Sequence, residues 1–438
     1  MRDDVKILID NGSIFTACEL CPWGCGMEVV IKDGKVTKIK GVKDHPLNRG
    51  MLCPKGKAAY AFVTHPDRIA YPMKKVDGKF VQISWDEAFD ILKEKLIFIK
   101  EKYGAKSFAV AIGMPILLGG NATVSFLRRF WDIYGSPNCF SVESICFRCR
   151  IIGYILTFGK FPVADIDHSS CIVLWGNNPT NSNPPAAMRI IKRVKEGAKL
   201  IVIDPRRIPL AKKADIHLMI RPGSDCALAL SMMNVLINEN LYDKEFVDKW
   251  CVGFDELKKL VFKYPPEAVE KIAGVDKELI KEAARLFGSI KPACVVQGTN
   301  ALDQHTTGLQ NARAIASLMA LTGNIDNKGG FVTTKRVHIS PIRLPEKLEG
   351  LPLGIDKFPL FYEVWGRVFG EGQAMVLANT ILTQKPYPIK ALFVAGSNPV
   401  LTWPETPKVK KALASLEFVA VMDLFLTDTA KYADLFLP

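Results

Sequence analysis

Four cysteines near the N-terminus have a spacing that lets them act together as thiolate ligands. Cys18, Cys21 and Cys25 follow a Cys-x2-Cys-x3-Cys pattern, and Cys53 stands further along the chain. A cubane iron–sulfur cluster needs four thiolates that meet in one small volume, and three can come from a single loop. The residues between Cys25 and Cys53 alternate apolar and polar side chains around an Asp-Gly pair, which predicts a β-hairpin that returns Cys53 to the others. The four cysteines therefore predict one 4Fe-4S cluster.

Zinc is the alternative partner of these thiolates, because tetrahedral zinc also accepts four of them. Zinc ribbons usually present two Cys-x2-Cys pairs, whereas this chain has one such pair, a third cysteine and a distant fourth. The chain holds 11 cysteines, an odd number, and shows no secretory signature, so a disulfide framework is not expected. Lys55 follows the fourth cysteine and is either an ordinary surface lysine or a cation that stabilises the negative cluster.

Composition and charge limit the class of protein. With 438 residues and 48% hydrophobic content, the chain can bury a large core and is expected to form two to four domains. Its apolar stretches are too short for a membrane span and no export signal is seen, so a cytoplasmic protein is expected. The net charge of +13 comes from scattered lysines, which gives little support to nucleic-acid binding. It favours an anionic, phosphate-rich ligand or an acidic redox partner.

Short apolar strands alternate with helices in the middle of the chain. We expect strands at Cys171–Trp175, Leu200–Ile203 and His217–Ile220, with helices at Pro185–Glu196 and after Asp225. Strands that alternate with helices in this way run parallel in a doubly wound sheet, and a ligand binds at their carboxyl ends. The residues that follow each strand are therefore candidates for a binding site.

Polar, glycine-rich segments follow all three strands. Loops of this composition point backbone N–H groups at a phosphate, and the next helix adds its positive end. A strand-end aspartate can accept hydrogen bonds from a ribose or a guanine. Each segment alone is often simple strand-to-helix punctuation, and none matches Gly-x-Gly-x-x-Gly, but three in register favour a nucleotide site. The candidate residues are Gly176, Asn177, Asn178, Asp204, Arg206, Gly223 and Asp225.

A second copy of this pattern stands late in the chain. Ala391–Pro399 repeats the strand and Gly-x-Asn-Pro loop of Val173–Pro179, and Glu417–Asp423 repeats the strand that ends in aspartate. Two matching half-sites imply a ligand with two similar halves, which an ordinary single-dinucleotide enzyme does not explain. The candidates of the second half-site are Gly396, Ser397, Asn398 and Asp423.

The ordered motifs resemble those of a known family. After the cysteines they are CPKG, WGNNP, IDPRR, RPGSD, LMALTGNIDNKGG and AGSNP. From Cys18 to Pro438 the chain thus resembles the molybdopterin oxidoreductases of the dimethyl sulfoxide reductase family, which bind molybdenum or tungsten between two pterin guanine dinucleotides. The resemblance implies that each half-site binds one dinucleotide, that Lys55 lies between cluster and pterin, and that Gln304 and Arg313 lie near the metal.

The resemblance also implies one protein ligand to the metal, after the GSPN segment. Cys139, Cys146 and Cys149 stand there, and the preceding Val-Glu-Ser-Ile favours Cys146. A thiolate suits a soft metal, and Arg148 and Arg150 would favour the thiolate form. The alternative for Cys146 is a buried cysteine that behaves as a small hydrophobe.

The fold class implied by the resemblance is α/β. A small β-rich iron–sulfur domain would occupy residues 1–65, a discontinuous doubly wound domain residues 66–142 and 315–438, and a second doubly wound domain residues 143–314. Each doubly wound domain would bind one dinucleotide. Family members continue into a C-terminal β-barrel domain, which is absent here. We therefore also expect a fragment, a chain whose separate partner supplies that domain, or an inactive remnant.

Three reactions occur in the family. A redox enzyme, similar here to thiosulfate and polysulfide reductases, would exchange two electrons with a small-molecule substrate by oxygen-atom, sulfur-atom or hydride-type chemistry. It would relay the electrons through the cluster to a ferredoxin-like iron–sulfur subunit. A tungsten hydratase similar to acetylene hydratase would need a catalytic aspartate where Pro22 stands, and a formate dehydrogenase a histidine where Phe147 stands. These departures favour the redox enzyme, with the hydratase as the alternative.

Overall fold

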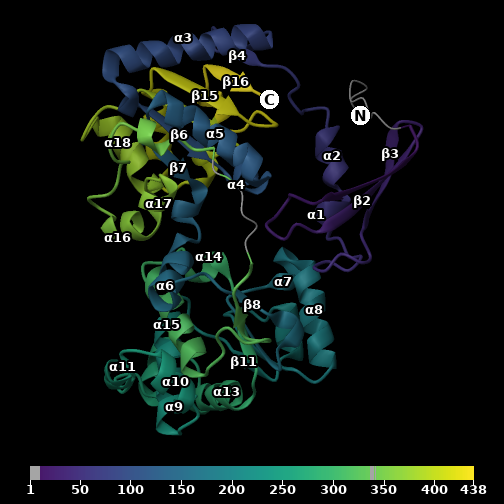
Figure 1. The fold of residues 1–438 in the computed structure, drawn as a ribbon, viewed down its shortest axis with the longest axis vertical. Helices are drawn as coiled ribbons and strands as arrows, with labels where there is room; N and C mark the ends of the chain where they lie inside the picture. The colour runs from purple at the N-terminus through teal and green to yellow at the C-terminus, as the bar shows by residue number, and fades with distance from the viewer. Residues whose placement is uncertain (1–9, 336–339, 341) are drawn as a thin grey trace. The chain divides into compact units, whose positions relative to one another are not determined.

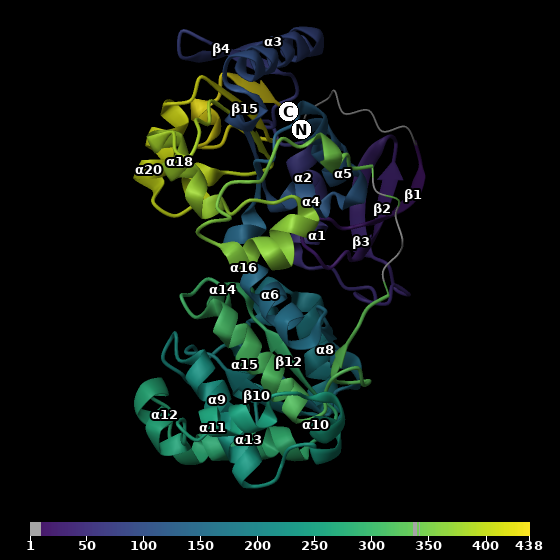
Figure 2. The same ribbon diagram turned by 60° about the vertical axis from the view of Figure 1, so that its left-hand side comes forward.

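The computed structural model of the chain describes residues 10–335, 340 and 342–438 (Figures 1 and 2). Internal contacts divide it into two units: unit 1 consists of Met1–Ile145 and His338–Pro438, and unit 2 of Cys146–Val337. The three expected domains stay a prediction; the stretch 315–337, expected with the discontinuous domain, belongs to unit 2. Among the described residues, none of the helices has the length and apolar character needed to cross a membrane.

The N-terminal part of unit 1 is an antiparallel sheet in the order β1-β2-β3. Its strands are β1 (Gly12–Ala17), β2 (Gly26–Lys32) and β3 (Lys35–Gly41). Asp33 and Gly34 join β2 to β3 with φ values of 48° and 66°, the left-handed pair that a tight hairpin turn requires. The predicted hairpin is thus confirmed. The helices α1 (Pro54–Lys57) and α2 (Ala59–Val63) follow it.

The core of unit 2 is a parallel sheet in the order β11-β10-β9-β12. Its strands are β9 (Cys171–Trp175), β10 (Lys199–Ile203), β11 (Ile216–Leu218) and β12 (Ala293–Gln297). The first three lie at the predicted positions with small shifts at their ends, whereas β12 was not predicted. Nearly all side chains of these strands are buried, as in parallel sheets packed between helices.

Helices make up most of the rest of unit 2. The predicted helix over residues 185–196 is α8, and the helix predicted after Asp225 is α9. The helices are α6 (Arg148–Phe158), α7 (Pro179–Ser182), α8 (Pro184–Lys195), α9 (Asp225–Asn238), α10 (Lys244–Trp250), α11 (Phe254–Val261), α12 (Pro266–Ala273), α13 (Lys277–Ser289), α14 (Thr299–Leu302) and α15 (Gly308–Leu321). The short strands β8 (Val163–Ala164) and β13 (Phe331–Val332) pair with each other.

Unit 1 contains a seven-stranded sheet in the order β5-β4-β16-β15-β14-β6-β7. Its strands are β4 (Met73–Val76), β5 (Lys79–Gln82), β6 (Phe108–Ile112), β7 (Cys139–Ser141), β14 (Ala391–Ala395), β15 (Phe418–Met422) and β16 (Leu435–Leu437). The hairpin β4–β5 is antiparallel, and the other strands run parallel. Because β6 and β7 come from the first segment and β14 to β16 from the last, this sheet is discontinuous in sequence, as expected.

Helices pack on this sheet, and α3 contacts β16 and β6 (Figure 1). Ser84 caps α3, its Oγ accepting a hydrogen bond from Glu87 N over 3.1 Å. The helices of unit 1 after α2 are α3 (Trp85–Tyr103), α4 (Met114–Leu118), α5 (Gly120–Tyr134), α16 (Pro359–Phe361), a π-helix (Tyr362–Gly366), α17 (Arg367–Phe369), α18 (Leu377–Thr383), α19 (Pro399–Thr402) and α20 (Thr406–Ala414).

The two larger sheets repeat one arrangement. The order β11-β10-β9-β12 in unit 2 corresponds to β16-β15-β14-β6 in unit 1, and all of these strands are parallel. The likeness extends to single residues: Asp215 Oδ2 accepts from Leu200 N over 2.9 Å, and Asp434 Oδ2 accepts from Val419 N over 2.8 Å. The internal repeat predicted from the sequence is confirmed.

Candidate functional site

The four N-terminal cysteines belong to unit 1. Burial raises the pKa of the Cys25 thiol, and the charges of Cys21, Cys18 and Cys53 raise it further, so all three lie within electrostatic range of Cys25. As the side chains stand, the described part of the chain contains no group of three or more cysteines, histidines or acidic residues placed to hold a metal ion. Cys18 N donates a hydrogen bond to Cys25 O over 2.8 Å and closes the loop. Because thiolates repel one another, all four ionise together only around a positive centre. In type and number these thiols are the donors that a 4Fe-4S cluster uses, and their assignment as its ligands stays a prediction.

A residue that sequence reasoning missed holds this loop to the returning chain. Asn48 is 3% exposed, and its Oδ1 accepts from Gly26 N over 2.9 Å. Its Nδ2 donates to Gly26 O over 3.1 Å and to Met51 O over 2.6 Å. Asn48 thus joins the strand after Cys25 to the residues just before Cys53. A lone asparagine carries no motif, so only the fold identifies it.

The Gly176 loop ends β9 in unit 2. Gly176 has a φ of 57°, and its amide donates to Ile203 O over 2.8 Å. Asn178 is the N-cap residue of α7, and Asn177 Nδ2 lies 3.4 Å from Gln297 O. Gly176 is therefore anchored to β10 and Asn177 to β12, while Asn178 begins α7.

Two predicted aspartates lie in this half-site. Asp204 is 1% exposed and accepts hydrogen bonds from Arg206 N at 2.9 Å and Arg206 Nε at 3.2 Å. Asp225 begins α9 and accepts from Trp175 Nε1 over 2.9 Å. Burial raises the pKa of the Asp225 carboxyl, although this hydrogen bond lowers it. Trp175 therefore orients a carboxylate that we expect to receive a hydrogen bond from a ligand.

The loop after β12 lies against these segments; Gln304 in this loop was predicted to lie near the metal, but Ala301 and His305 were not predicted as part of the site. A Cβ at Gly223 would lie 2.8 Å from His305 Nε2, and a Cβ at Gly176 would lie 2.8 Å from Ala301 Cβ. The positive charge of His305 also lowers the pKa of Asp225. The available signal was the glycine that ends β12, as glycines end β9 and β14.

The second half-site, in unit 1, follows the same plan. Gly396 has a φ of 54°, and its amide donates to Met422 O over 2.8 Å. Asn398 is the N-cap residue of α19. Asp423 N donates to Leu437 O over 3.1 Å, in the position that Asp204 has in unit 2.

Ser397 completes this half-site with an unused polar group. The residue is 6% exposed, and its Oγ has no hydrogen-bond partner among the residues that the structure describes. Burial raises the pKa of the Asp423 carboxyl at the neighbouring strand end. A buried hydroxyl without a partner is costly unless a ligand pairs with it. The half-site is thus suited to a polar ligand.

A close approach of two backbones occurs at the same place in each of the two larger sheets. A Cβ at Gly298, after β12, would overlap the carbonyl oxygen of Gly176, and a Cβ at Gly113, after β6, would overlap that of Gly396. We expect Gly298→Ala and Gly113→Ala each to lower the free energy of unfolding by about 3 kcal/mol, because the strand ends must separate. Gly78→Ala, with open space but a φ of 79°, should cost only about 1 kcal/mol. Equal losses in chemical denaturation would contradict the close approach.

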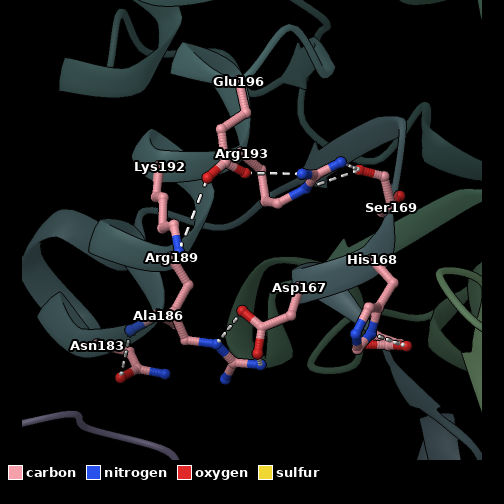
Figure 3. A network of polar contacts seen from close by, with 10 residues as sticks. Asp167, His168, Ser169, Asn183, Ala186, Arg189, Lys192, Arg193 and Glu196 are labelled. Atoms are coloured by element: carbon pink, nitrogen blue, oxygen red, sulfur yellow. Dashed lines mark hydrogen bonds and ion pairs between the residues drawn. The ribbon is translucent and has the colours of Figure 1, made fainter.

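Ionic contacts fix the helix that follows the Gly176 loop (Figure 3). Arg189 binds Asp167 with two hydrogen bonds, of 2.9 and 3.0 Å, and Arg193 donates to Ser169 O over 3.0 and 3.2 Å. Asn183 caps the start of α8. Because the arginines lie on α8 and their partners just before β9, these contacts hold the helix to the strand.

The three candidate metal-binding cysteines differ in burial. Cys139 in β7 is fully buried, which raises its pKa to about 12. Burial also raises the pKa of Cys149, in the first turn of α6, and the charge of Asp303 raises it further. A metal binds the thiolate form, so full burial disfavours Cys139, whereas Cys149 is partly exposed, as Cys146 is. Cys146, in the turn before α6, is partly exposed and stays the predicted ligand.

A segment far along the chain braces the loop that leads to Cys146. Gly372 N donates to Cys139 O over 2.8 Å, and Gln373 Nε2 donates to Ser144 O over 2.9 Å. Glu371, which is fully buried, accepts hydrogen bonds from the Ser141 hydroxyl and, over 2.7 Å, from Trp365 Nε1. This brace, residues 371–373, was not predicted because it follows an irregular, proline-rich stretch.

Glu371→Ala is expected to loosen the loop, since it removes the acceptor of the buried Ser141 hydroxyl and of the partly buried Trp365 Nε1. We expect a loss of about 2–3 kcal/mol in the free energy of unfolding and faster hydrogen exchange at the amides of residues 139–145. Glu363→Ala is the matched control, because the Glu363 side chain is 61% exposed in the adjoining π-helix. If exchange in the loop were the same in both variants, Glu371 would not brace it.

The remaining predicted residues are solvent-exposed. Lys55 lies in α1, two residues after Cys53. Gln304 follows α14, and Arg313 lies on α15, where its Nη1 donates to Gln310 Oε1 over 3.2 Å. Gln304 and Arg313 share unit 2 with Cys146, whereas Lys55 belongs to unit 1. Their roles at the metal stay predictions.

Comparisons with known proteins agree with this geometry. The family model described as molybdopterin oxidoreductase matches residues 68–438, and the molybdopterin oxidoreductase Fe4S4 domain matches residues 13–65. The F420-dependent formate dehydrogenase subunit alpha of Methanocaldococcus jannaschii is 35% identical over 97% of this chain and 63% of its own length. Acetylene hydratase of Syntrophotalea acetylenica is 34% identical over 96% of this chain and 62% of its own length.

A solved structure shares the fold. Acetylene hydratase from Pelobacter acetylenicus matches with a TM-score of 0.89 and 34% identity, over 97% of this chain and 62% of that one. This match confirms the expected α/β class with an N-terminal iron–sulfur domain. The chain spans less than two thirds of the length of these relatives.

Proposed function

Because the chain belongs to the molybdopterin oxidoreductase family, we propose that it binds two pterin guanine dinucleotides and takes part in a two-electron reaction on a small-molecule substrate. Its family cofactors are a 4Fe-4S cluster and a molybdopterin that carries molybdenum or tungsten. When bound, the metal exchanges two electrons with the substrate and the cluster relays them singly.

The observation that carries this proposal is the repeated strand-end half-site. In each unit, one strand of a parallel sheet is followed by a Gly-x-Asn-Pro loop, and the neighbouring strand is followed by an aspartate. The two units would therefore each hold one dinucleotide. The unpaired Ser397 hydroxyl and the Asp225 carboxylate, oriented by Trp175, would hydrogen-bond to polar groups of the ligand. Loop amides at Gly176 and Gly396 would face phosphates.

The proposal also assigns roles to individual side chains at the cluster and at the metal. Cys18, Cys21, Cys25 and Cys53 would hold the cluster, and Lys55 would stabilise its negative charge. Cys146 would bind the metal as a thiolate, with Gln304 and Arg313 close to the substrate. Because a thiolate is a soft ligand, it suits molybdenum or tungsten.

Two positions at which this sequence differs from the hydratase and from the formate enzyme separate the candidate reactions. The relatives are named formate dehydrogenase and acetylene hydratase. Pro22, at the position where the resemblance places a catalytic aspartate of the hydratase, has no group that can give a proton. Phe147, at the position of the formate enzyme's histidine, has none either. We propose oxygen-atom, sulfur-atom or hydride-type redox chemistry, and keep hydration as the second candidate because of the TM-score of 0.89.

The partners belong to the same proposal. Relatives named as alpha subunits of formate dehydrogenases match the chain, so we propose a ferredoxin-like iron–sulfur subunit as electron partner. A cytoplasmic location completes the proposal.

The test is metal analysis and electron paramagnetic resonance of protein purified without oxygen. We expect about four irons per chain and molybdenum or tungsten. Zinc without iron would contradict the proposal. Assays with formate or thiosulfate and a viologen dye, beside acetylene hydration, separate the reactions, because hydration consumes no reducing equivalents.

A further inference from the structure

An ion pair is buried in unit 2 among residues to which no binding role has been assigned. The Asp303 side chain is 0% exposed, and its Oδ2 lies 3.2 Å from Arg150 Nη2, on a side chain that is 12% exposed. A carboxylate taken out of water is costly unless its partners satisfy it fully. Among the described residues, none hydrogen-bonds to Asp303 Oδ2 or to Arg150 Nε in good geometry. The pair is therefore only partly satisfied.

Uncharged groups accept hydrogen bonds from Arg150, and an amide lies beside the Asp303 carboxylate. Arg150 donates to Gln297 O and to Thr299 Oγ1, each over 3.2 Å. Tyr154 OH donates to Gln297 Oε1 over 2.8 Å, which leaves Gln297 Nε2 turned to Asp303 Oδ1 at 3.5 Å. The Arg150 guanidinium pairs with Gln297 O, Thr299 Oγ1 and the Asp303 carboxyl. Its N–H groups are therefore shared, and the ion pair with Asp303 is weaker than one in which all of them point to the carboxylate.

Burial and partial pairing with Arg150 act in opposite directions on the pKa of the Asp303 carboxyl. Burial raises the pKa of the Asp303 carboxyl to about 7, although the ion pair with Arg150 lowers it. The titratable groups that face it are Cys149, Arg150 and Tyr154, all on α6. β12 and α14 contribute the amide and hydroxyl named above. A group that titrates near neutral pH inside a site is a candidate for proton chemistry.

The pair lies near the turn that carries the predicted metal ligand. The charge of Asp303 acts on the Cys149 thiol, and Cys149 follows Cys146 by three residues, about one helical turn. Gln304, predicted to lie near the metal, follows Asp303 directly. All of these residues belong to unit 2.

We propose that Asp303 stores a proton for the metal site of unit 2, with Arg150 setting its charge and Tyr154 and Gln297 fixing its orientation. The inference rests on the proposed function, because it takes Cys146 as the metal ligand. When the site accepts one electron from a reductant such as dithionite, one proton from water adds to the Asp303 carboxylate. The proton returns to water when the electron leaves, so the net charge of the site stays constant.

The first test is a carbon-13 NMR titration of aspartate carboxyls in the full chain, made without metal. We expect one carboxyl to titrate near pH 7, to be missing in Asp303→Asn and to remain in Asp326→Asn, which removes a half-exposed aspartate of the same unit. If every aspartate titrates below about pH 5, the proposal is overturned. If Asp303→Asn does not fold, Tyr154→Phe must shift the same signal, and an unmoved signal overturns the proposal.

The second test is a redox titration of the holoenzyme, followed by the paramagnetic signal of its molybdenum or tungsten. Above pH 7 the midpoint potential should fall as pH rises in the wild type and in Asp326→Asn, and this dependence should flatten in Asp303→Asn. The same dependence in all three overturns the proposal. A preparation that never binds the metal contradicts the proposed function instead, while the NMR titration of that chain still decides whether Asp303 holds the proton.

Discussion

Replacing Cys146 by alanine is expected to lower turnover of the holoenzyme by more than about a hundredfold, since losing even an outer hydrogen-bond partner of a metal ligand costs ten- to a hundredfold. Molybdenum or tungsten content should fall with it, and iron content should stay unchanged. The two metal contents report separately, because Cys146 belongs to unit 2 and the four N-terminal cysteines to unit 1. Elemental analysis and a viologen assay on the same preparation measure both effects.

Cys149→Ala is the matched control for this prediction. Cys149 lies in the first turn of α6, three residues after Cys146, and burial raises the pKa of its thiol. Its removal should change turnover only slightly. If Cys149→Ala removed the metal and Cys146→Ala did not, the ligand would be Cys149 and the assignment would be wrong.

Cys25→Ser is expected to remove the iron–sulfur cluster, with iron content and visible absorption falling close to zero. Three thiolates remain, but a cubane cluster needs four ligands, so the incomplete set holds iron poorly. Metal binding to such a small domain contributes directly to its folding. We therefore also expect faster proteolysis within the hairpin of β2 and β3, measured by mass spectrometry of the fragments.

Cys251→Ser serves as the control for the cluster. Cys251 is partly exposed at the end of α10 in unit 2, far along the chain from the cluster loop. Iron content and proteolysis of the hairpin should match the wild type. A Cys25→Ser protein that keeps its cluster absorption would show that the ligand set is different.

Local spacing was enough to predict several parts of the fold. The hairpin after Cys25 depends on an Asp-Gly pair and on apolar and polar side chains that alternate along each strand, and both patterns are visible within a few residues. The strands β9 and β10 are compact apolar runs, and the polar residues after them had to lie at the ligand edge of a parallel sheet. The motif order then placed Cys146 and the two half-sites within a family.

Contacts between distant segments could not be predicted in this way. Asp303 meets Arg150 only because β12 pairs with β9 and brings the loop after it onto α6. Glu371 reaches Ser141 only through the insertion that separates α15 from β14. In the sequence, both are ordinary acidic residues in polar surroundings.

The residue types and their local spacing thus determined the strand ends and the repeated loops and predicted the cluster ligands, because each depends on a few neighbouring residues. The tertiary structure decided which strands are neighbours, and therefore which carboxylates are buried, paired or braced. Burial and pairing set the charge of Asp303 and the hydrogen bonds of Glu371, and both depend on segments that meet only when the chain folds.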